Sequence, residues 1–290
     1  MSRMVTDAEA GPRLADLLRA GVARLARGGV DDPRREVSRI WADLAGMAPG
    51  DALRLADRHA DRELVTRFDT AIGRRAAGEP LPYVTGLAGF RRLTLHADRR
   101  ALIPRPETEG LVALVLAHAP TGRVVDVGTG TGCIALALAQ EGRYDSVVAV
   151  DHSADALALA RENCLATGLR IGLVRSDLLC GFGPDAFDVV VSNPPYLTLA
   201  EYTSLDGSVR DWEPVAALPS GADGLEATRR LMGEALGRLR PGGLLALEVD
   251  ANRAQDVAEL GRAPGWTGVT VHHDLFDRAR YVLAWRSEFS

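Results

Sequence analysis

Apolar side chains in the first 78 residues recur every three to four positions, and no stretch there shows the alternation of a strand. A first helical stretch ends at Gly28-Gly29, a second begins behind Asp32, and a third ends near Gly78. The pattern therefore predicts a small helical domain of three or more helices over residues 1–78.

The pattern changes after residue 78. Residues 79–103 contain prolines and glycines followed by an alternating Leu93-Thr94-Leu95, which predicts a β-hairpin linker. From about residue 105, apolar runs of strand length alternate with helical stretches. Strands are expected at Val124–Val127, Val147–Val150, Ile171–Val174, Val189–Ser192, Leu244–Val249, Val269–His272 and Tyr281–Trp285, and helices at 107–118, 131–141, 154–167, 225–239 and 251–262. This predicts an α/β domain over residues 104–290, with a doubly wound parallel sheet covered on both faces.

The composition limits which binding partners and which cellular compartment can be expected for this protein. The 290 residues carry a net charge of −5, which provides no global attraction for nucleic acid or anionic membrane. Three cysteines without CxxC spacing (Cys133, Cys164 and Cys180) favour free thiols in a reducing compartment, and we assign no metal ligands. The N-terminus lacks a signal-like apolar segment, and all apolar runs are far shorter than a membrane span. We expect a cytoplasmic, monomeric protein that contacts neither nucleic acid nor membrane directly.

A glycine-rich loop follows the first strand of the α/β region, in "VVDVGTGTGCIALALA". The strand ends at Val127, a helix begins behind the loop, and the loop itself is Gly128, Thr129, Gly130, Thr131 and Gly132. Glycines allow a tight turn and a close approach to a ligand at a helix N-terminus. On its own this pattern is also typical of an ordinary tight turn.

The second strand ends in an acidic residue, Asp151, nineteen residues after Gly132. A carboxylate at this position can accept hydrogen bonds from both ribose hydroxyls of a nucleoside. Asp151 can also act as the N-cap of the helix from Ala154, and the two roles are compatible. Together with the glycine loop, Asp151 predicts a nucleoside-binding site.

The glycine spacing distinguishes between nucleotide classes. The pattern is GxGxG, whereas dinucleotide folds usually place the third glycine three positions after the second. The chain contains no lysine, which excludes a standard P-loop. "DVGTGTG" resembles the first motif of S-adenosylmethionine-dependent methyltransferases, which implies that cofactor, with the loop under its methionine part. By the same resemblance Asp177 and Leu178 would border the adenine, although Leu178 also suits plain core packing.

A polar motif ends the fourth strand, in "VSNPPYL" (Val191–Leu197). Proline has no N–H donor, so the strand must stop at Asn193. In a doubly wound sheet this end lies beside the glycine loop, which places Asn193 opposite the sulfonium methyl of the cofactor. The Asn193 side-chain oxygen and the Pro194 carbonyl can accept both N–H groups of a planar NH₂ group, with Tyr196 against its plane. The alternative is a plain turn with a surface tyrosine.

Four motifs in this order resemble those of the HemK family of protein-glutamine N5-methyltransferases, in particular those that act on release factors. They are "LIPRPETE" (Leu102–Glu109), "DVGTGTG", "NPPY" and "VRDWEP" (Val209–Pro214), behind a helical region and a "PLPYVTG" linker. The resemblance implies a class I, Rossmann-like domain of seven strands behind a small helical domain. It also implies methyl transfer from S-adenosyl-L-methionine to the glutamine amide in the GGQ loop of a peptide-chain release factor, which the N-terminal helices would help to recognise.

The resemblance also assigns roles to residues. Gly128 to Gly132, Asp151, Asp177, Leu178 and Asn193 would bind the cofactor, and Asn193, Pro194, Pro195 and Tyr196 would form the glutamine slot. Arg105 and Glu107 would shape the site, although a helix cap with a local ion pair explains them as well. Phe90 would cover the cofactor or substrate, or else pack within the hairpin.

Some positions depart from the family pattern, and other substrates stay open. Gly89 replaces an acidic residue, Leu93 or Leu95 an aromatic one, and Val249-Asp250 an expected glycine, all at the edge of the substrate slot. A DNA adenine methyltransferase would need a recognition domain and a positive groove, but residues 198–224 are too few and the net charge is negative. A nucleoside-binding domain without transfer conflicts with the intact NPPY motif. The proline and threonine of "RPETE" disfavour a ribosomal-protein glutamine methyltransferase. A small-molecule methyltransferase remains an alternative.

Overall fold

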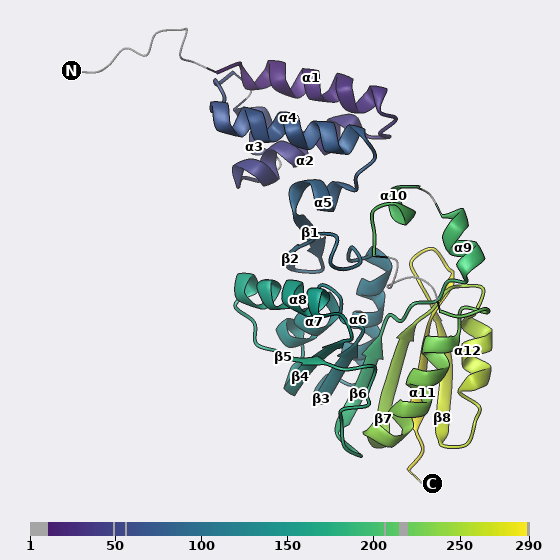
Figure 1. Ribbon diagram of the computed structural model, residues 1–290. Coiled ribbons are helices and arrows are strands. Elements are labelled where there is room, and N and C mark those ends of the chain that lie inside the picture. Colours follow the sequence, from purple (N-terminus) through teal and green to yellow (C-terminus); the bar gives the residue numbers. More distant parts are fainter. Residues whose placement is uncertain (1–10, 49, 56, 206, 215–219, 289–290) are drawn as a thin grey trace. The chain divides into compact units, whose positions relative to one another are not determined.

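The computed structural model describes residues 11–48, 50–55, 57–205, 207–214 and 220–288 (Figure 1). The chain forms two compact units, each with its own core. One consists of the residues up to Leu87 together with Gly207–Trp212, and the other of the rest of the chain. None of the helices in the described ranges is long and apolar enough to span a membrane.

The first unit is helical, as predicted. Its helices are α1 (Leu14–Arg27), α2 (Pro33–Ala45), α3 (Asp51–Arg54), α4 (Arg62–Ala76), α5 (Leu81–Thr85) and α10 (Gly207–Arg210). Asp32 caps α2 by accepting a hydrogen bond from the Arg35 N–H at 3.2 Å, and Asp61 caps α4 in the same way. The core between these helices contains Trp41 edge-on to Phe68, with ring centroids 5.4 Å apart.

The predicted hairpin is present, but it is shorter than the predicted linker. β1 (Leu87–Phe90) and β2 (Leu93–His96) pair as a two-stranded sheet. The preceding Leu81–Thr85, which we expected to belong to the hairpin, is the helix α5 instead. Pro82 stands in its first turn, where proline needs no N–H partner, and Gly86 ends it with a left-handed φ of +75°.

All seven predicted strands occur in one sheet of the second unit. They are β3 (Thr121–Val127), β4 (Arg143–Asp151), β5 (Gly172–Arg175), β6 (Phe187–Ser192), β7 (Leu239–Glu248), β8 (Trp266–His273) and β9 (Ala279–Arg286), in the order β5-β4-β3-β6-β7-β9-β8. The strands from β3 to β7 are parallel, as predicted, but the sheet as a whole is mixed, because β9 runs antiparallel to both β7 and β8. Only residues 274–278 join β8 to β9, and a connection that short cannot make the crossover that parallel neighbours need.

Helices cover both faces of this sheet (Figure 1). They are α6 (Pro106–His118), α7 (Cys133–Glu141), α8 (Ala154–Thr167), α11 (Glu226–Arg238) and α12 (Ala254–Leu260), whereas α9 (Leu199–Ser204) has no buried residue and covers neither face. Successive strand residues point to opposite faces: Val124 packs with α6 and α7, and Val125 with α11 and α12. The sequence did not predict α9, which Thr198 and Glu201 begin with a capping box.

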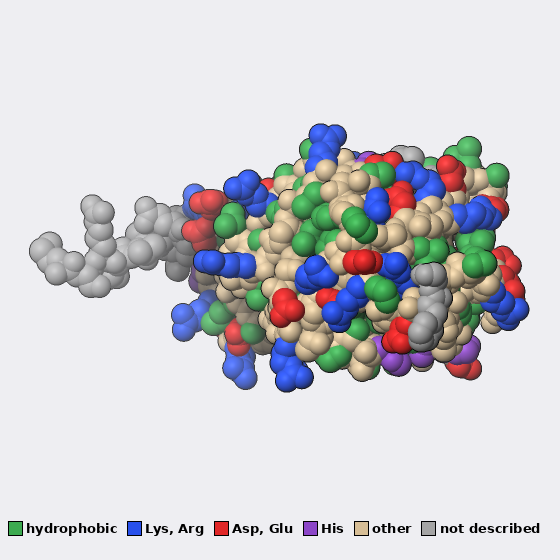
Figure 2. All heavy atoms as spheres, turned by 90° about the horizontal axis from the view of Figure 1, so that it is seen from below, with side chains coloured by type: hydrophobic (Ala, Val, Ile, Leu, Met, Phe, Trp, Pro, Cys, Tyr) green, Lys and Arg blue, Asp and Glu red, His purple; other side chains and the backbone are tan. Residues whose placement is uncertain are grey.

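The amino-terminal edge of the sheet carries opposite charges close together. Asp188 at the start of β6 lies 3.6 Å from Arg123 and also contacts Arg240, and Arg286 pairs with Asp185. Figure 2, which shows the molecule from below, has arginines interspersed with acidic and hydrophobic side chains. Among the described residues of this face, basic and acidic side chains are therefore mixed.

Candidate active site

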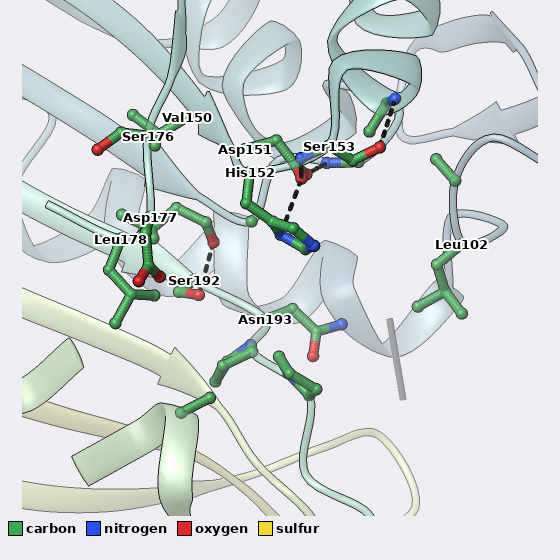
Figure 3. Close-up of a pocket in the computed structure, with 18 of the residues that line it drawn as sticks. Leu102, Val150, Asp151, His152, Ser153, Ser176, Asp177, Leu178, Ser192 and Asn193 are labelled. Atoms are coloured by element: carbon green, nitrogen blue, oxygen red, sulfur yellow. Dashed lines mark hydrogen bonds and ion pairs between the residues drawn. The ribbon is translucent and has the colours of Figure 1, made fainter. Parts of the chain in front are cut away.

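The carboxyl ends of β3, β4 and β6 surround a cavity of about 250 Å³ (Figure 3). In the strand order, β4 and β5 lie on one side of β3, whereas β6 and β7 lie on the other. The end of β3 is therefore the topological switch point of the sheet, which is where ligands bind in this architecture. The structure brings most of the predicted site residues together around this cavity. The lining includes Gly128, Gly130, Asp151, Asp177, Leu178, Asn193, Pro194 and Pro195.

The glycine loop is fastened to the end of β4. The N–H groups of Gly128 and Thr129 both donate to the Val150 carbonyl, at 2.8 and 2.9 Å. Gly128 and Gly130 have φ values of +72° and +55°, which L side chains rarely adopt. The backbone of the loop therefore lies open to the cavity with no Cβ atom in between, as a closely held cofactor requires.

Three of the five predicted loop residues lie beneath this surface rather than on it. Thr129 and Thr131 are buried, at 4% and 2% exposure, and Thr129 Oγ1 donates to Asp126 Oδ2 at 2.6 Å. A Cβ on Gly132 would come within 3.3 Å of the Ala160 Cβ, so this glycine allows α7 to approach α8. Alternate residues of the turn point to opposite sides, so Thr129, Thr131 and Gly132 face the protein interior. They shape the loop rather than line the cavity.

Asp126 is a loop support for which the sequence analysis assigned no role. Its carboxylate is fully buried and accepts from Thr129 Oγ1 and from the Ala135 N–H at 3.2 Å, joining β3, the loop and α7. Burial raises the pKa of Asp126 to about 7, against the opposing effect of these two hydrogen bonds. An acidic residue inside the otherwise apolar "VVDV" run is the signal that could have identified it.

Asp151 connects the loop to the end of β4. Its Oδ2 accepts from the Gly130 N–H at 3.0 Å, and its Oδ1 from the Ser153 N–H at 2.9 Å. The helix α8 takes its N-cap from Ser153, whose hydroxyl accepts from the Ala156 N–H, so the interpretation of Asp151 as that cap is wrong. Figure 3 shows Asp151 at the cavity beside His152. His152 is a lining residue that was not predicted from the sequence.

The far wall of the cavity contains the two residues expected near an adenine. Asp177 lies at the surface and pairs with Arg230 of α11 at 2.7 Å. Leu178 adopts a left-handed φ of 49°, lines the cavity and also packs against the core behind it, so both of its proposed roles are compatible. Arg230 could not be identified from the sequence, because an arginine on an amphipathic helix is ordinarily a solvent-facing residue.

The NPPY motif follows β6, whose end pairs with the end of β3 directly beside the glycine loop. The Ser192 hydroxyl donates to the Val127 carbonyl at 2.6 Å, which ties the ends of β6 and β3 together. Asn193 Nδ2 donates to Thr108 Oγ1 at 3.3 Å, and Pro194 and Pro195 continue the cavity wall. Tyr196 does not line the cavity; burial raises the pKa of its hydroxyl, which therefore stays protonated.

Comparison with known proteins shows which protein family the chain belongs to. A model described as the PrmC N-terminal domain matches residues 16–86, and one described as the methyltransferase small domain matches residues 108–205. The release factor glutamine methyltransferase of Cereibacter sphaeroides is 42% identical over 275 residues, which cover 94% of this chain and 98% of the relative. That of Deinococcus radiodurans is 40% identical over 279 residues, covering 95% and 99%. The chain belongs to the release factor glutamine methyltransferase family.

One solved structure supports the assignment of the fold. A methyltransferase from Pyrococcus furiosus is 22% identical and superposes with a TM-score of 0.51, covering 66% of this chain and 87% of that one. The seven-stranded sheet is thus the class I fold of S-adenosylmethionine-dependent methyltransferases. The cavity suits that cofactor, because positive-φ glycines expose the loop backbone beside the carboxylate of Asp151.

Two motifs of this methyltransferase meet in an ion pair. Arg105 of "LIPRPETE" makes no side-chain cap hydrogen bond to α6 and instead donates to Glu213 of "VRDWEP" at 2.7 Å. The Glu213 side chain is 1% exposed, and burial raises its pKa. Glu107 pairs with Arg278 at 3.2 Å. Neither Arg105 nor Glu107 lines the cavity, and both ion pairs connect segments remote in sequence rather than being local.

Phe90 lies outside the cavity lining. It is 1% exposed and belongs to the core that includes Leu93 and Leu95 of the hairpin and Leu111 of α6. Hairpin packing is therefore the role that the structure supports, since an alternating strand turns this side chain inward. Leu93 and Leu95, one of which stands where the family pattern is expected to have an aromatic residue, are buried in the same core.

Glu248 is a buried carboxyl behind Asn193, at the end of β7. It is 2% exposed, and burial raises its pKa from 4.5 to about 7, although Thr108 and Arg280 lower it. Because the folded state holds this proton more tightly than the unfolded state, Glu248 destabilises the fold progressively as the pH rises from 4.5 to about 7.

Glu248→Gln should therefore flatten the pH dependence of stability. A shift of this size corresponds to roughly 3 kcal/mol, at about 1.4 kcal/mol per pKa unit. Urea unfolding at pH 5 and pH 8 is the measurement. Between these values the wild type should lose up to roughly 3 kcal/mol of unfolding free energy relative to the variant. Parallel losses in the two proteins would show that Glu248 ionises as easily in the folded chain as in the unfolded one.

Proposed function

We propose that this protein transfers a methyl group from S-adenosyl-L-methionine to the side-chain amide nitrogen of the glutamine in the GGQ loop of a peptide-chain release factor. The observation that carries the proposal is the position of Asn193, which follows β6 beside the glycine loop and lines the same cavity, with its Nδ2 bonded to Thr108. The release factor glutamine methyltransferases that are about 40% identical over nearly the whole chain support the substrate.

Asn193 and Pro194 address the main difficulty of the reaction. The lone pair of an amide nitrogen is delocalised into its carbonyl, so the nitrogen is a weak nucleophile. The Asn193 side-chain oxygen and the Pro194 carbonyl can accept its two N–H groups, which aims the nitrogen and stabilises the positive charge that develops on it. When bound, the cofactor supplies an electrophilic methyl group on a sulfonium. As the N–C bond forms, the S–C bond breaks, and the extra proton then leaves the nitrogen for solvent.

The rest of the cavity is proposed to hold the cofactor. Asp151 retains lone pairs on both carboxylate oxygens beyond those used by Gly130 and Ser153, and these would accept the ribose hydroxyls. Asp177 and Leu178 would border the adenine. The side chains of Thr129 and Thr131 would act through the shape of the loop rather than by contact.

The helical unit is proposed to recognise the release factor, since residues 16–86 match the model described as the PrmC N-terminal domain and carry none of the residues described around the cavity. With a net charge of −5, direct contact with nucleic acid is disfavoured. We also propose that the protein acts as a monomer in the cytoplasm, where release factors work.

The direct test is methyl transfer to a purified release factor. With isotopically labelled S-adenosylmethionine, mass spectrometry of the GGQ peptide should show one added methyl group on the glutamine. A release factor in which that glutamine is alanine should accept none. Transfer to the alanine form, or no transfer to the natural factor, would contradict the proposed substrate.

A further inference from the structure

One wall of the cavity comes from the segment between β2 and α6. Arg100, Ala101 and Leu102 of this segment line the cavity, and Figure 3 shows Leu102 across the cavity from the segment that follows β5. A Cβ atom built on Gly130 would lie 3.7 Å from the Ala101 Cβ, so this wall also passes close to the glycine loop. We call residues 97–102 the strap.

The strap begins beside a fully buried amide side chain of α8. Asn163 is 0% exposed; its Oδ1 accepts from the His96 N–H at 2.6 Å, and its Nδ2 donates to the His96 carbonyl at 3.1 Å. The amide thus pairs with the last residue of β2 much as a neighbouring strand would. Nδ2 also donates to the Thr131 carbonyl of the glycine loop at 2.9 Å. The oxygen and both N–H groups of Asn163 therefore join β2, α8 and the loop.

The other half of the strap is fastened to the preceding residue of the same helix. Arg100 donates to the two carboxylate oxygens of Glu162 through Nη1 and Nη2, at 2.7 Å each. Asp98 accepts from the Arg100 N–H at 3.0 Å and from its guanidinium, which closes a turn inside the strap. Ala101, which is 3% exposed, packs against buried apolar side chains of α8. The strap is therefore held to α8 at both of its ends.

The same helix is linked to the other elements around the cavity. Ser153, the N-cap of α8, donates its N–H to Asp151 at 2.9 Å, and Asp151 accepts from the Gly130 N–H at 3.0 Å. The ribose acceptor, the glycine loop and the strap are thus tied to one helix, at separations that do not depend on a ligand. A site that is already ordered spares its ligand the entropic cost of ordering a segment of chain.

We propose that Asn163 and Glu162 are positioning residues for S-adenosyl-L-methionine, which hold the strap in its cofactor-binding position. The inference rests on the part of the proposed function that places the cofactor in this cavity, and it is independent of the methyl acceptor. Asn163 and Glu162 lie outside the cavity lining, so both act through the strap. Without them the cofactor itself would have to order the strap, and its affinity would fall by that cost.

Asn163→Ala should raise the Kd for S-adenosyl-L-methionine roughly 10- to 100-fold, because it releases the start of the strap. At saturating cofactor, kcat for release-factor methylation should stay within about threefold of wild type, since Asn193 remains in place. Calorimetric titration gives the Kd, and steady-state kinetics give kcat. A Kd for folded Asn163→Ala within about twofold of wild type would overturn the inference.

Val257→Ala is the control for a general loss of stability. It removes a fully buried side chain from α12, which packs against β8 and β9 rather than against the strap. It should lower the unfolding free energy but leave the Kd for the cofactor within about twofold of wild type. An equal loss of cofactor affinity in Val257→Ala and Asn163→Ala would show that stability alone sets the affinity, which would overturn the inference.

Hydrogen exchange of the strap amides measures positioning without turnover. In the absence of cofactor, a peptide covering residues 96–102 should exchange at least about tenfold faster in Asn163→Ala than in wild type. Saturating cofactor should restore its protection, because the bound cofactor then orders the strap. Unchanged exchange of this peptide would overturn the inference. Wild-type protein that binds the cofactor and protects the strap but methylates no release factor would instead contradict the proposed methyl acceptor alone.

Glu162→Ala tests the second link in a variant that should fold in any case, because the Glu162 side chain is 49% exposed. It should raise the Kd for the cofactor about two- to fivefold, as expected for a partly exposed ion pair, and speed the exchange of the strap peptide. Asp155→Ala removes the same charge from the exposed first turn of α8 and should leave the strap exchange unchanged. Strap exchange and a Kd in Glu162→Ala that match those of Asp155→Ala would overturn the inference.

Discussion

Asn193→Ala is expected to lower kcat for release-factor methylation by about 10³-fold or more, while the Kd for S-adenosylmethionine changes less than about threefold. The substitution removes the side-chain oxygen that would accept a substrate N–H. The amide nitrogen of the substrate glutamine is then no longer oriented toward the methyl group, and it loses a dipole that stabilises its developing charge. The glycine loop and Asp151, which would hold the cofactor, keep all their hydrogen bonds. Single-turnover kinetics and calorimetric titration of the cofactor measure the two quantities separately.

The matched control is Asn252→Ala, at an exposed asparagine behind β7 whose side chain lies outside the cavity lining. It should leave kcat and Kd unchanged. Substantial turnover by Asn193→Ala would remove the central role assigned to this residue. A comparable loss of cofactor affinity would instead show that Asn193 acts mainly by holding the cofactor.

Asp151→Ala should weaken cofactor binding by about 100-fold or more. The carboxylate would supply charge-assisted hydrogen bonds to the ribose, each worth roughly 1.5–3 kcal/mol. It also holds the Gly130 N–H at 3.0 Å, so the variant loses part of the support of the loop. Equilibrium dialysis with labelled cofactor gives the affinity directly. At saturating cofactor, kcat should recover to within about tenfold of wild type, because Asn193 remains in place.

Asp155→Ala serves as the control for Asp151, since this carboxylate lies exposed on the first turn of α8 and lines no part of the cavity. It removes the same charge nearby and should change the Kd less than about threefold. If both variants weakened binding equally, the effect would come from local charge rather than from hydrogen bonds to Asp151.

Local sequence signals predicted much of the fold and part of the site. Glycines with positive φ and prolines that end a strand affect only the backbone within a few residues. The loop at Gly128 and the end of β6 before Asn193 could therefore be predicted from the sequence. The strands were equally clear, because a strand buried on both faces is an uninterrupted apolar run. The direction of β9 depends on the length of the connection between β8 and β9, and the apolar pattern did not predict where that connection begins and ends.

The supporting contacts were not predictable in this way. Thr108 meets Asn193 only because the fold brings the first turn of α6 to the end of β6, and Glu248 lies near them because the sheet order places β7 beside β6. Arg105 and Glu213 belong to two of the motifs, but nothing in either motif indicates that these residues pair. A single sequence shows which residues suit a role, whereas the partners of those residues follow from the topology.

The helical unit is not one continuous piece of chain, because it includes Gly207–Trp212 as well as the residues up to Leu87. A single cut therefore cannot separate the two units. A shortened protein lacking residues 1–87 would keep this segment without the unit it belongs to, directly ahead of Glu213, the partner of Arg105. Substrate recognition by the helical unit is thus better measured by exchanging exposed side chains on its helices than by truncation.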